Sequence, residues 1–264
     1  RAERRSKKTG SGVEFADYRE YSVGDDYRHV DWNAYGRLGR LLLRLYETEE
    51  DLCVDLLIDC SRSMAFGAPT KLDYAKKLSA ALAYVNLSHL DRVAINAFRD
   101  GVYENLPATR GRHRIFGVFE FLRALTPEGG TDLAASAGAL AARLKRRGVV
   151  ILLSDLYDAS GFERGVNRLR YAKQEVYVIQ LTSSEDARPA LRGDVDLVDS
   201  ETGEMRSATI TPELLDRYAQ ARSAHQERIA RFCAEKHVPL FVLDTSVSPE
   251  DAMLRILRRG GMLR

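Results

Sequence analysis

Residues 52–64 read LCVDLLIDCSRSM, an apolar run that ends in the loop Asp59-Cys60-Ser61-Arg62-Ser63. The run has the length and the composition of a β-strand that is buried on both faces. An Asp-x-Ser-x-Ser loop directly after such a strand places three oxygen-bearing side chains at its carboxyl end. Because ligands of open parallel sheets bind beyond the carboxyl ends of the strands, this stretch predicts both an α/β fold and a candidate site.

Strand-like and helix-like segments alternate along the rest of the chain. The expected strands are 52–59, 93–98, 149–155, 176–182 and 238–244, and the expected helices are 72–85, 115–125, 132–147, 212–236 and 248–259. This alternation is typical of a mostly parallel sheet with helices on both faces. We predict that α/β fold for residues 51–264, with an exposed, charged insertion at about residues 183–210.

Residues 1–50 precede the alternation and are rich in Tyr, Asp, Arg and Gly. We predict that they form an N-terminal extension packed on the sheet, with the run 41–46 extending one of its edges. The extension alternates basic with acidic side chains, which suits internal ion pairs around Trp32 and Tyr21 and a turn at Gly24-Asp25. These charged residues are Arg19, Arg28 and Arg37 with Glu14, Glu20, Asp25, Asp26 and Asp31. A binding role for the extension stays open beside this structural one.

Charge and hydropathy exclude several function classes. The 264 residues include 40 Lys and Arg against 38 Asp and Glu, but five of the basic and one of the acidic residues lie within the first eight, so the remainder is slightly acidic. We therefore expect no dedicated nucleic-acid surface. The apolar run 149–154 is far shorter than a membrane span of about 18–20 residues. The basic start lacks the apolar segment of a secretory signal.

The cysteines point to a compartment. Cys53, Cys60 and Cys233 have no metal-binding spacing and cannot all pair with one another. Reduced thiols are typical of cytoplasmic proteins, so we expect a cytoplasmic location, with association at a membrane through a partner left open. Because the sequence begins with Arg1, a longer protein with an anchor elsewhere also stays open.

Two more oxygen-bearing residues occupy places equivalent to the Asp-x-Ser-x-Ser loop. Thr131 follows Gly129-Gly130 just before the Ala-rich helix, and Asp155 ends the strand 149–155. The complete candidate set is Asp59, Ser61, Ser63, Thr131 and Asp155. Two carboxylates with three hydroxyls form a hard-oxygen set that suits Mg²⁺ or Mn²⁺. The neutral hydroxyls leave the ion electrophilic, which suits capture of a carboxylate from a partner.

Each candidate also has an ordinary structural explanation. Ser61 and Ser63 are suited to cap the next helix, and Thr131 is a natural cap for the helix that follows it. A strand that ends in Asp is common. We favour the metal site because all five residues occur together at matching places.

The five residues resemble, at every position, the metal-ion-dependent adhesion site of von Willebrand factor A domains. The resemblance implies a von Willebrand A-like, Rossmann-like sheet flanked by helices. It also implies that Ser61, Ser63 and sometimes Thr131 touch the metal directly, while Asp59 and Asp155 act mostly through water.

The N-terminal region carries a second resemblance. The segments that carry it are Gly12-Val13-Glu14-Phe15, Tyr18-Arg19-Glu20-Tyr21, Gly24-Asp25-Asp26-Tyr27-Arg28 and Val30-Asp31-Trp32. They resemble the signature of the bacterial domain-of-unknown-function 58 family, whose members carry this segment directly ahead of a von Willebrand A-like domain. The resemblance implies a MoxR-type AAA+ ATPase or its client protein as the partner, and a role as adaptor or co-chaperone.

Two other functions have specific weaknesses. A Mg²⁺-dependent phosphohydrolase would use Asp59 as its nucleophile. Ser61, however, stands where phosphatases of the haloacid-dehalogenase type usually carry a second Asp, and a hydroxyl cannot serve as the general acid near neutral pH. An adhesion receptor needs an export route and usually disulfides, and the sequence displays neither. We therefore expect a binding protein and not an enzyme.

Overall fold

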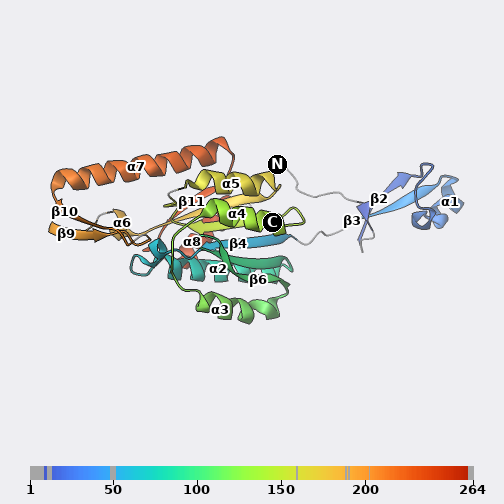
Figure 1. The fold of residues 1–264 in the computed structure, drawn as a ribbon. Helices are drawn as coiled ribbons and strands as arrows, with labels where there is room; N and C mark the ends of the chain where they lie inside the picture. The colour runs from blue at the N-terminus through green and yellow to red at the C-terminus, as the bar shows by residue number, and fades with distance from the viewer. Residues whose placement is uncertain are drawn as a thin grey trace. The chain divides into compact units, whose positions relative to one another are not determined.

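The computed structural model describes residues 9–10, 14–47, 52–158, 160–187, 189, 191–201 and 203–260. The chain divides into two compact units, residues 1–51 and residues 52–264. Figure 1 shows the elements of each unit.

The first unit contains a three-stranded antiparallel sheet with the order β1-β3-β2. Its elements are β1 (Thr9–Gly10), β2 (Glu14–Glu20), α1 (Trp32–Leu38) and β3 (Leu42–Glu47). The prediction that residues 41–46 extend the central sheet is therefore wrong. A partner close in sequence takes this run instead, because β2 pairs with β3 from Glu20 opposite Leu42 onward.

Ion pairs occur in this unit as expected, but they do not surround Trp32. Arg19 pairs with Asp25 and Arg28 pairs with Asp26, each at 2.8 Å. The Trp32 side chain is 61% exposed and contacts the ring of a neighbouring tyrosine edge-on. The charged pairs thus order the loop before α1 and leave the tryptophan at the surface.

Asp31 joins the elements of the first unit. Its carboxylate caps α1 by accepting from the backbone N–H groups of Asn33 and Ala34, both at 3.0 Å. It also accepts from the Arg44 side chain of β3 and from the Tyr18 hydroxyl of β2, both at 2.8 Å. These bonds, led by the one from Arg44, hold the pKa of Asp31 well below its usual range.

The second unit contains a six-stranded sheet with the order β11-β8-β7-β4-β5-β6. Its strands are β4 (Cys53–Asp59), β5 (Arg92–Phe98), β6 (Val102–Arg110), β7 (Val149–Ser154), β8 (Glu175–Thr182) and β11 (Leu240–Asp244). Neighbouring strands are parallel except that β6 runs antiparallel to β5. The mostly parallel sheet predicted from the sequence is confirmed, whereas β6 was missed because it is an edge strand with mixed polarity and a proline.

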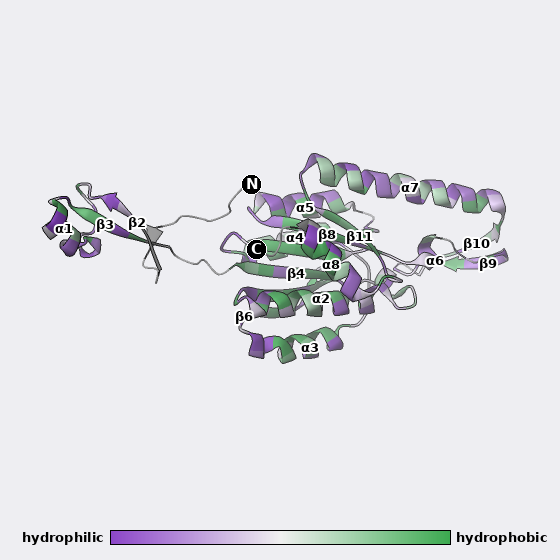
Figure 2. Ribbon diagram, turned by 180° about the vertical axis from the view of Figure 1, so that it is seen from behind, coloured by the Kyte–Doolittle hydropathy of each residue, from purple (hydrophilic) through white to green (hydrophobic). Residues whose placement is uncertain are grey.

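Helices cover both faces of this sheet. The helices are α2 (Lys71–Ser88), α3 (Ile115–Ala124), α4 (Leu133–Arg143), α5 (Phe162–Tyr171), α7 (Pro212–Glu235) and α8 (Pro249–Gly260). One apolar cluster packs α2, α3 and α8 against the sheet, and a second packs α4, α5 and α7 against it. Figure 2 shows the apolar residues gathered in the strands and in the helices beside them. Helix α5, which was not expected, is short and has many arginines.

Residues along β4 alternate between the two apolar clusters. Leu56 and Ile58 belong to one cluster, and Leu57 belongs to the other, each with 0% exposure. Burial of both faces explains why the strand is apolar almost without interruption.

The strand order reverses beside β4. The chain continues from β4 to β5 and β6 on one side, and then crosses to β7 and β8 on the other. The point between β4 and β7 is therefore the topological switch point, where ligands of open α/β sheets bind.

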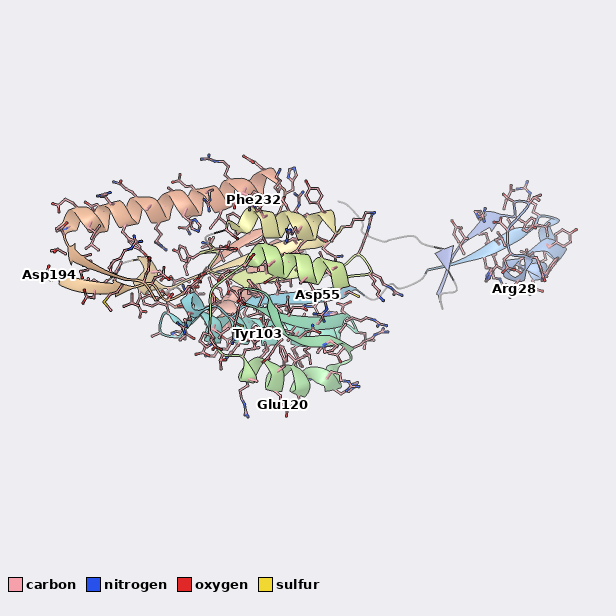
Figure 3. The ribbon with its side chains drawn as sticks, viewed as in Figure 1. Arg28, Asp55, Tyr103, Glu120, Asp194 and Phe232 are labelled. Atoms are coloured by element: carbon pink, nitrogen blue, oxygen red, sulfur yellow. The ribbon has the colours of Figure 1, made fainter. Side chains whose placement is uncertain are left out.

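The segment after β8 forms a small substructure of its own. It contains α6 (Ser184–Ala187) and a two-stranded antiparallel hairpin of β9 (Gly193–Val198) and β10 (Met205–Ile210). Asp194, labelled in Figure 3, lies in this hairpin. Across the described ranges, none of the helices is both long and apolar enough to cross a membrane.

Candidate metal centre

Asp59 is the last residue of β4, and its side chain is fully buried. One carboxylate oxygen accepts from the backbone N–H of Ser61 at 2.9 Å, and the other accepts from the Ser154 hydroxyl at 2.6 Å. Burial raises the pKa of Asp59 above its usual value, and the charge of Asp155 raises it further. The carboxylate therefore sits next to a second acid at the switch point of the sheet.

The two serines of the loop lie side by side. The Ser61 and Ser63 hydroxyl oxygens are 3.1 Å apart. Ligands that surround Mg²⁺ octahedrally at about 2.1 Å are about 3.0 Å from their neighbours. The spacing of these hydroxyls thus fits two adjacent ligands of such an ion.

The loop that carries Thr131 is tied to the serine loop by two backbone hydrogen bonds. The N–H of Arg62 donates to the carbonyl of Gly129 at 3.0 Å, and the N–H of Glu128 donates to the carbonyl of Cys60 at 2.9 Å. These bonds bring Thr131 to the same end of the sheet as the serines.

Other residues perform the capping for which these hydroxyls were also suited. Thr70 caps α2 through its side chain, and Ser61 makes no side-chain capping bond. Asp132 caps α4 by accepting from Ala135 N–H at 2.7 Å. The helix-capping alternative therefore does not account for Ser61 or Thr131.

Asp155 follows β7 and is 1% exposed. One of its oxygens accepts from Lys71 Nζ at 2.7 Å, and the other accepts from the Tyr157 N–H at 3.2 Å. The next residue, Leu156, is buried with a φ of +62°, a backbone conformation that is strained for leucine. Such strain gathers at functional sites.

Lys71 was not predicted from the sequence, although it is the first residue of α2 and 2% exposed. Its ammonium also pairs with Asp186 of α6 at 3.2 Å. Burial lowers the pKa of Lys71, but the charges of Asp155 and Asp186 outweigh it, so the pKa lies above the usual value. A lysine in the first turn of a helix is unfavourable because that end of the helix carries a partial positive charge. This unfavourable position is the feature of the sequence that indicates a pairing of Lys71 with carboxylates.

A further acidic side chain reaches Thr131 from the hairpin. Glu201, in the turn between β9 and β10, accepts from the Thr131 hydroxyl at 3.2 Å. Nothing in the sequence pattern distinguished Glu201 from the other acids of that turn.

The residues at the switch point fit a small divalent cation. Their oxygens come from two buried or nearly buried carboxylates and from hydroxyls, which are ligands that Mg²⁺ and Mn²⁺ accept. In the part of the chain that the structure describes, no group of three or more His, Cys, Asp or Glu is arranged to hold a metal ion. The candidate set is of another kind, because three of its five members are hydroxyl residues.

Residues 17–228 match the family described as "Protein of unknown function DUF58". The chain belongs to the DUF58 family. It is 30% identical over 241 residues to the "Uncharacterized protein Rv1480" of Mycobacterium tuberculosis, and to the "Uncharacterized protein Mb1516" of Mycobacterium bovis, covering 89% of this chain and 76% of each relative.

The fold of this DUF58 chain is von Willebrand A-like. A solved structure of an aerotolerance-related membrane protein from Bacteroides fragilis is similar to it with a TM-score of 0.51 and 18% identity, covering 80% of this chain and 100% of that one. The protein BatB from Bacteroides thetaiotaomicron is similar over 80% of this chain and 98% of that one, with 17% identity and a TM-score of 0.49. The family match confirms the expected family, and the similarity to the Bacteroides fragilis structure confirms the expected fold.

Proposed function

We propose that this DUF58 protein is a metal-dependent protein-binding module. In this proposal Mg²⁺ or Mn²⁺ is held by Asp59, Ser61, Ser63, Thr131 and Asp155, and a carboxylate of a partner protein completes its coordination. The observation that carries the proposal is the pair of serine hydroxyls 3.1 Å apart, in a loop bonded to the threonine loop, beside two buried carboxylates. When bound, the cation supplies a positive centre that attracts a carboxylate.

The chain's own residues shape this centre. Asp59 holds the serine loop by accepting from the Ser61 N–H, and Ser154 fixes the second oxygen of that carboxylate. Asp155 is fixed by Lys71 and by a backbone N–H. Both carboxylates are thus immobilised before any cation binds, which lowers the entropy lost on binding.

We propose binding rather than catalysis. The groups bonded to Asp59 are a backbone N–H and a serine hydroxyl, and neither is an effective general acid near neutral pH. Lys71, the cation beside Asp155, has a raised pKa and so holds its proton. These observations weigh against a phosphohydrolase that uses Asp59 as a nucleophile.

The partner proposed is a MoxR-type AAA+ ATPase or its client protein, with the chain acting as adaptor or co-chaperone in the cytoplasm. The resemblance of the N-terminal signature supports this part of the proposal, and the site's preference for an acidic ligand is compatible with it.

Mn²⁺ binding to the full chain tests the metal site. Wild type should bind Mn²⁺, measured by electron paramagnetic resonance of the free ion, and Asp59→Ala should bind it at least ten-fold more weakly. Asp55→Asn is the matched control, because Asp55 is another buried carboxylate of β4 and lies four residues from the site. Equal binding by wild type and Asp59→Ala would overturn the metal site.

Retention from native cell extract tests the partner. The immobilised chain should retain a protein in Mg²⁺ that it does not retain in EDTA or as Asp59→Ala, and an AAA+ ATPase among the retained proteins would support the adaptor role. Identical retention in all three arms would contradict metal-dependent binding. Hydrolysis of p-nitrophenyl phosphate that disappears in Asp59→Asn would favour the phosphohydrolase instead.

A further inference from the structure

The turn of the β9–β10 hairpin holds one carboxylate in a defined position. The N–H of Glu201 donates to the Asp199 carboxylate at 2.8 Å, and the N–H of Gly203 donates to the Asp199 carbonyl at 2.9 Å. Gly203 has a φ of +74°, which glycine adopts without strain. The backbone N–H groups of Glu201 and Gly203 are thus both bonded to Asp199.

Glu201 contacts the part of the candidate metal centre that lies on the threonine loop. Its Oε1 accepts from the Thr131 hydroxyl at 3.2 Å. A Cβ added at Gly130 would lie 3.4 Å from its Oε2, so the carboxylate rests directly against the loop backbone. The 3.2 Å spacing is close to the distance of about 3.0 Å between adjacent ligands of an octahedral Mg²⁺.

This contact brings another negative charge to an acidic place. Asp59 lies beside Asp155, and the ammonium of Lys71 is already shared between Asp155 and Asp186. A divalent cation held at the hydroxyls of this end of the sheet would offset part of this negative charge.

We propose that Glu201 is an internal ligand of the metal, which occupies the coordination position of the partner's carboxylate in the free protein. This inference rests on the proposed function, because it concerns the occupant of the same cation site. The hairpin must then withdraw before a partner carboxylate binds, and the free protein is held in a state of low affinity for its partner.

The hairpin is built in a way that permits this withdrawal. Its strands pair with each other and are not part of the six-stranded sheet. Most of the side chains of β9 and β10 are exposed. Moving the hairpin therefore removes few apolar side chains from the core.

Mn²⁺ bound to the full chain tests the inference, because the relaxation of water protons depends on how many water molecules the ion holds. Wild type and Glu201→Gln are compared with Glu204→Gln, which removes the same charge from the same hairpin, where Glu204 pairs with Arg206 at 3.1 Å. Glu201→Ala repeats the test without an amide that could coordinate. Circular dichroism checks that each variant is folded.

We expect Glu201→Gln and Glu201→Ala to bind Mn²⁺ about ten-fold more weakly than wild type and to show higher water relaxation per bound ion. Millimolar acetate, as a free carboxylate, should lower that relaxation in both variants and leave wild type and Glu204→Gln unchanged. Identical affinity, relaxation and acetate response in all four proteins would overturn the internal ligand while the metal site stands. Failure of wild type to bind Mn²⁺ would overturn both the proposed function and this inference.

Discussion

Replacing Asp59 by asparagine should stabilise the metal-free protein and abolish its response to Mg²⁺. Asparagine has the shape of aspartate, and its side-chain oxygen can still accept from the Ser61 N–H. The substitution removes a charge that is fully buried and close to Asp155. Because asparagine keeps the shape of the side chain but not its charge, the substitution separates the structural role of this position from its proposed metal-binding role.

The magnitude follows from two opposing effects. Burial and the charge of Asp155 raise the pKa of Asp59. For each pKa unit of this increase, the charged carboxylate destabilises the folded protein by about 1.4 kcal/mol. The Ser154 hydroxyl loses the acceptor to which it donates at 2.6 Å, which costs about 1 kcal/mol. We expect a net gain of about 1–3 kcal/mol in the free energy of unfolding. For a unit of this size that is an increase of about 2–12 °C in Tm.

Calorimetry in EDTA and in Mg²⁺ measures both parts. In EDTA, Asp59→Asn should melt above wild type. At a Mg²⁺ concentration of about 100 times the Kd, wild type should gain about 2.7 kcal/mol, or about 5–10 °C, and the variant should gain nothing.

Asp55→Asn is the control, because Asp55, labelled in Figure 3, is another buried carboxylate on the same strand. It should keep the full Mg²⁺ response. Destabilisation of Asp59→Asn by more than about 2 kcal/mol in EDTA would show that Asp59 is mainly a structural acceptor. A Mg²⁺ response like that of wild type would refute the reasoning altogether.

Three further predictions concern the supporting structure. Lys71→Met leaves two carboxylates without the ammonium that joins them. In EDTA it should lower the free energy of unfolding, measured by urea unfolding, by about 3–5 kcal/mol. A loss below about 1 kcal/mol would contradict the stabilising role of the ion pair. Gly165→Ala places a Cβ 2.9 Å from a backbone oxygen of α4 and should lower the free energy of unfolding by about 1–3 kcal/mol. In the control Gly138→Ala, the added Cβ meets only the movable end of an arginine side chain, so the free energy of unfolding should change little. Equal losses in the two variants would refute this close packing of α4 and α5. Because the pKa of Asp31 is lowered in the folded state, the first unit should lose stability as the pH falls below about 4. The fluorescence of Trp32, the single tryptophan, follows this loss. Asp31→Asn should remove the pH dependence, and an unchanged pH profile in this variant would contradict the role given to Asp31.

Local sequence was sufficient to predict where the candidate residues that follow β4 would lie. Asp59, Ser61 and Ser63 lie within five residues at the end of an apolar strand, so their proximity depends on one turn of backbone. Thr131 and Asp155 could be predicted from the strand and helix rhythm, since the carboxyl ends of parallel strands meet at one edge. The structure places the loops of all five at that edge, as expected.

Contacts between distant segments could not be predicted in this way. Lys71 meets Asp155 across 84 residues, and Thr131 meets Glu201 across 70. Both depend on how α2 and the β9–β10 hairpin return to the switch point, and periodicity carries no information about that. The misplacement of run 41–46 has the same origin, because strand propensity does not specify which strand will be the partner.

The Lys71 ion pair gives a reason why the candidate site would fold without the proposed cation. Zinc fingers unfold without metal, because metal binding supplies their folding free energy. Here Asp155 has an ammonium at 2.7 Å, and Asp59 has two hydrogen-bond donors, so the chain itself compensates both carboxylates in part. In the proposed function, a cation would add a few kcal/mol to a fold that the chain forms by itself, and it would be gained and lost together with a partner. Because such coupling is reciprocal, a partner carboxylate that displaces Glu201 and binds the ion more tightly must raise the affinity for the ion by the same factor.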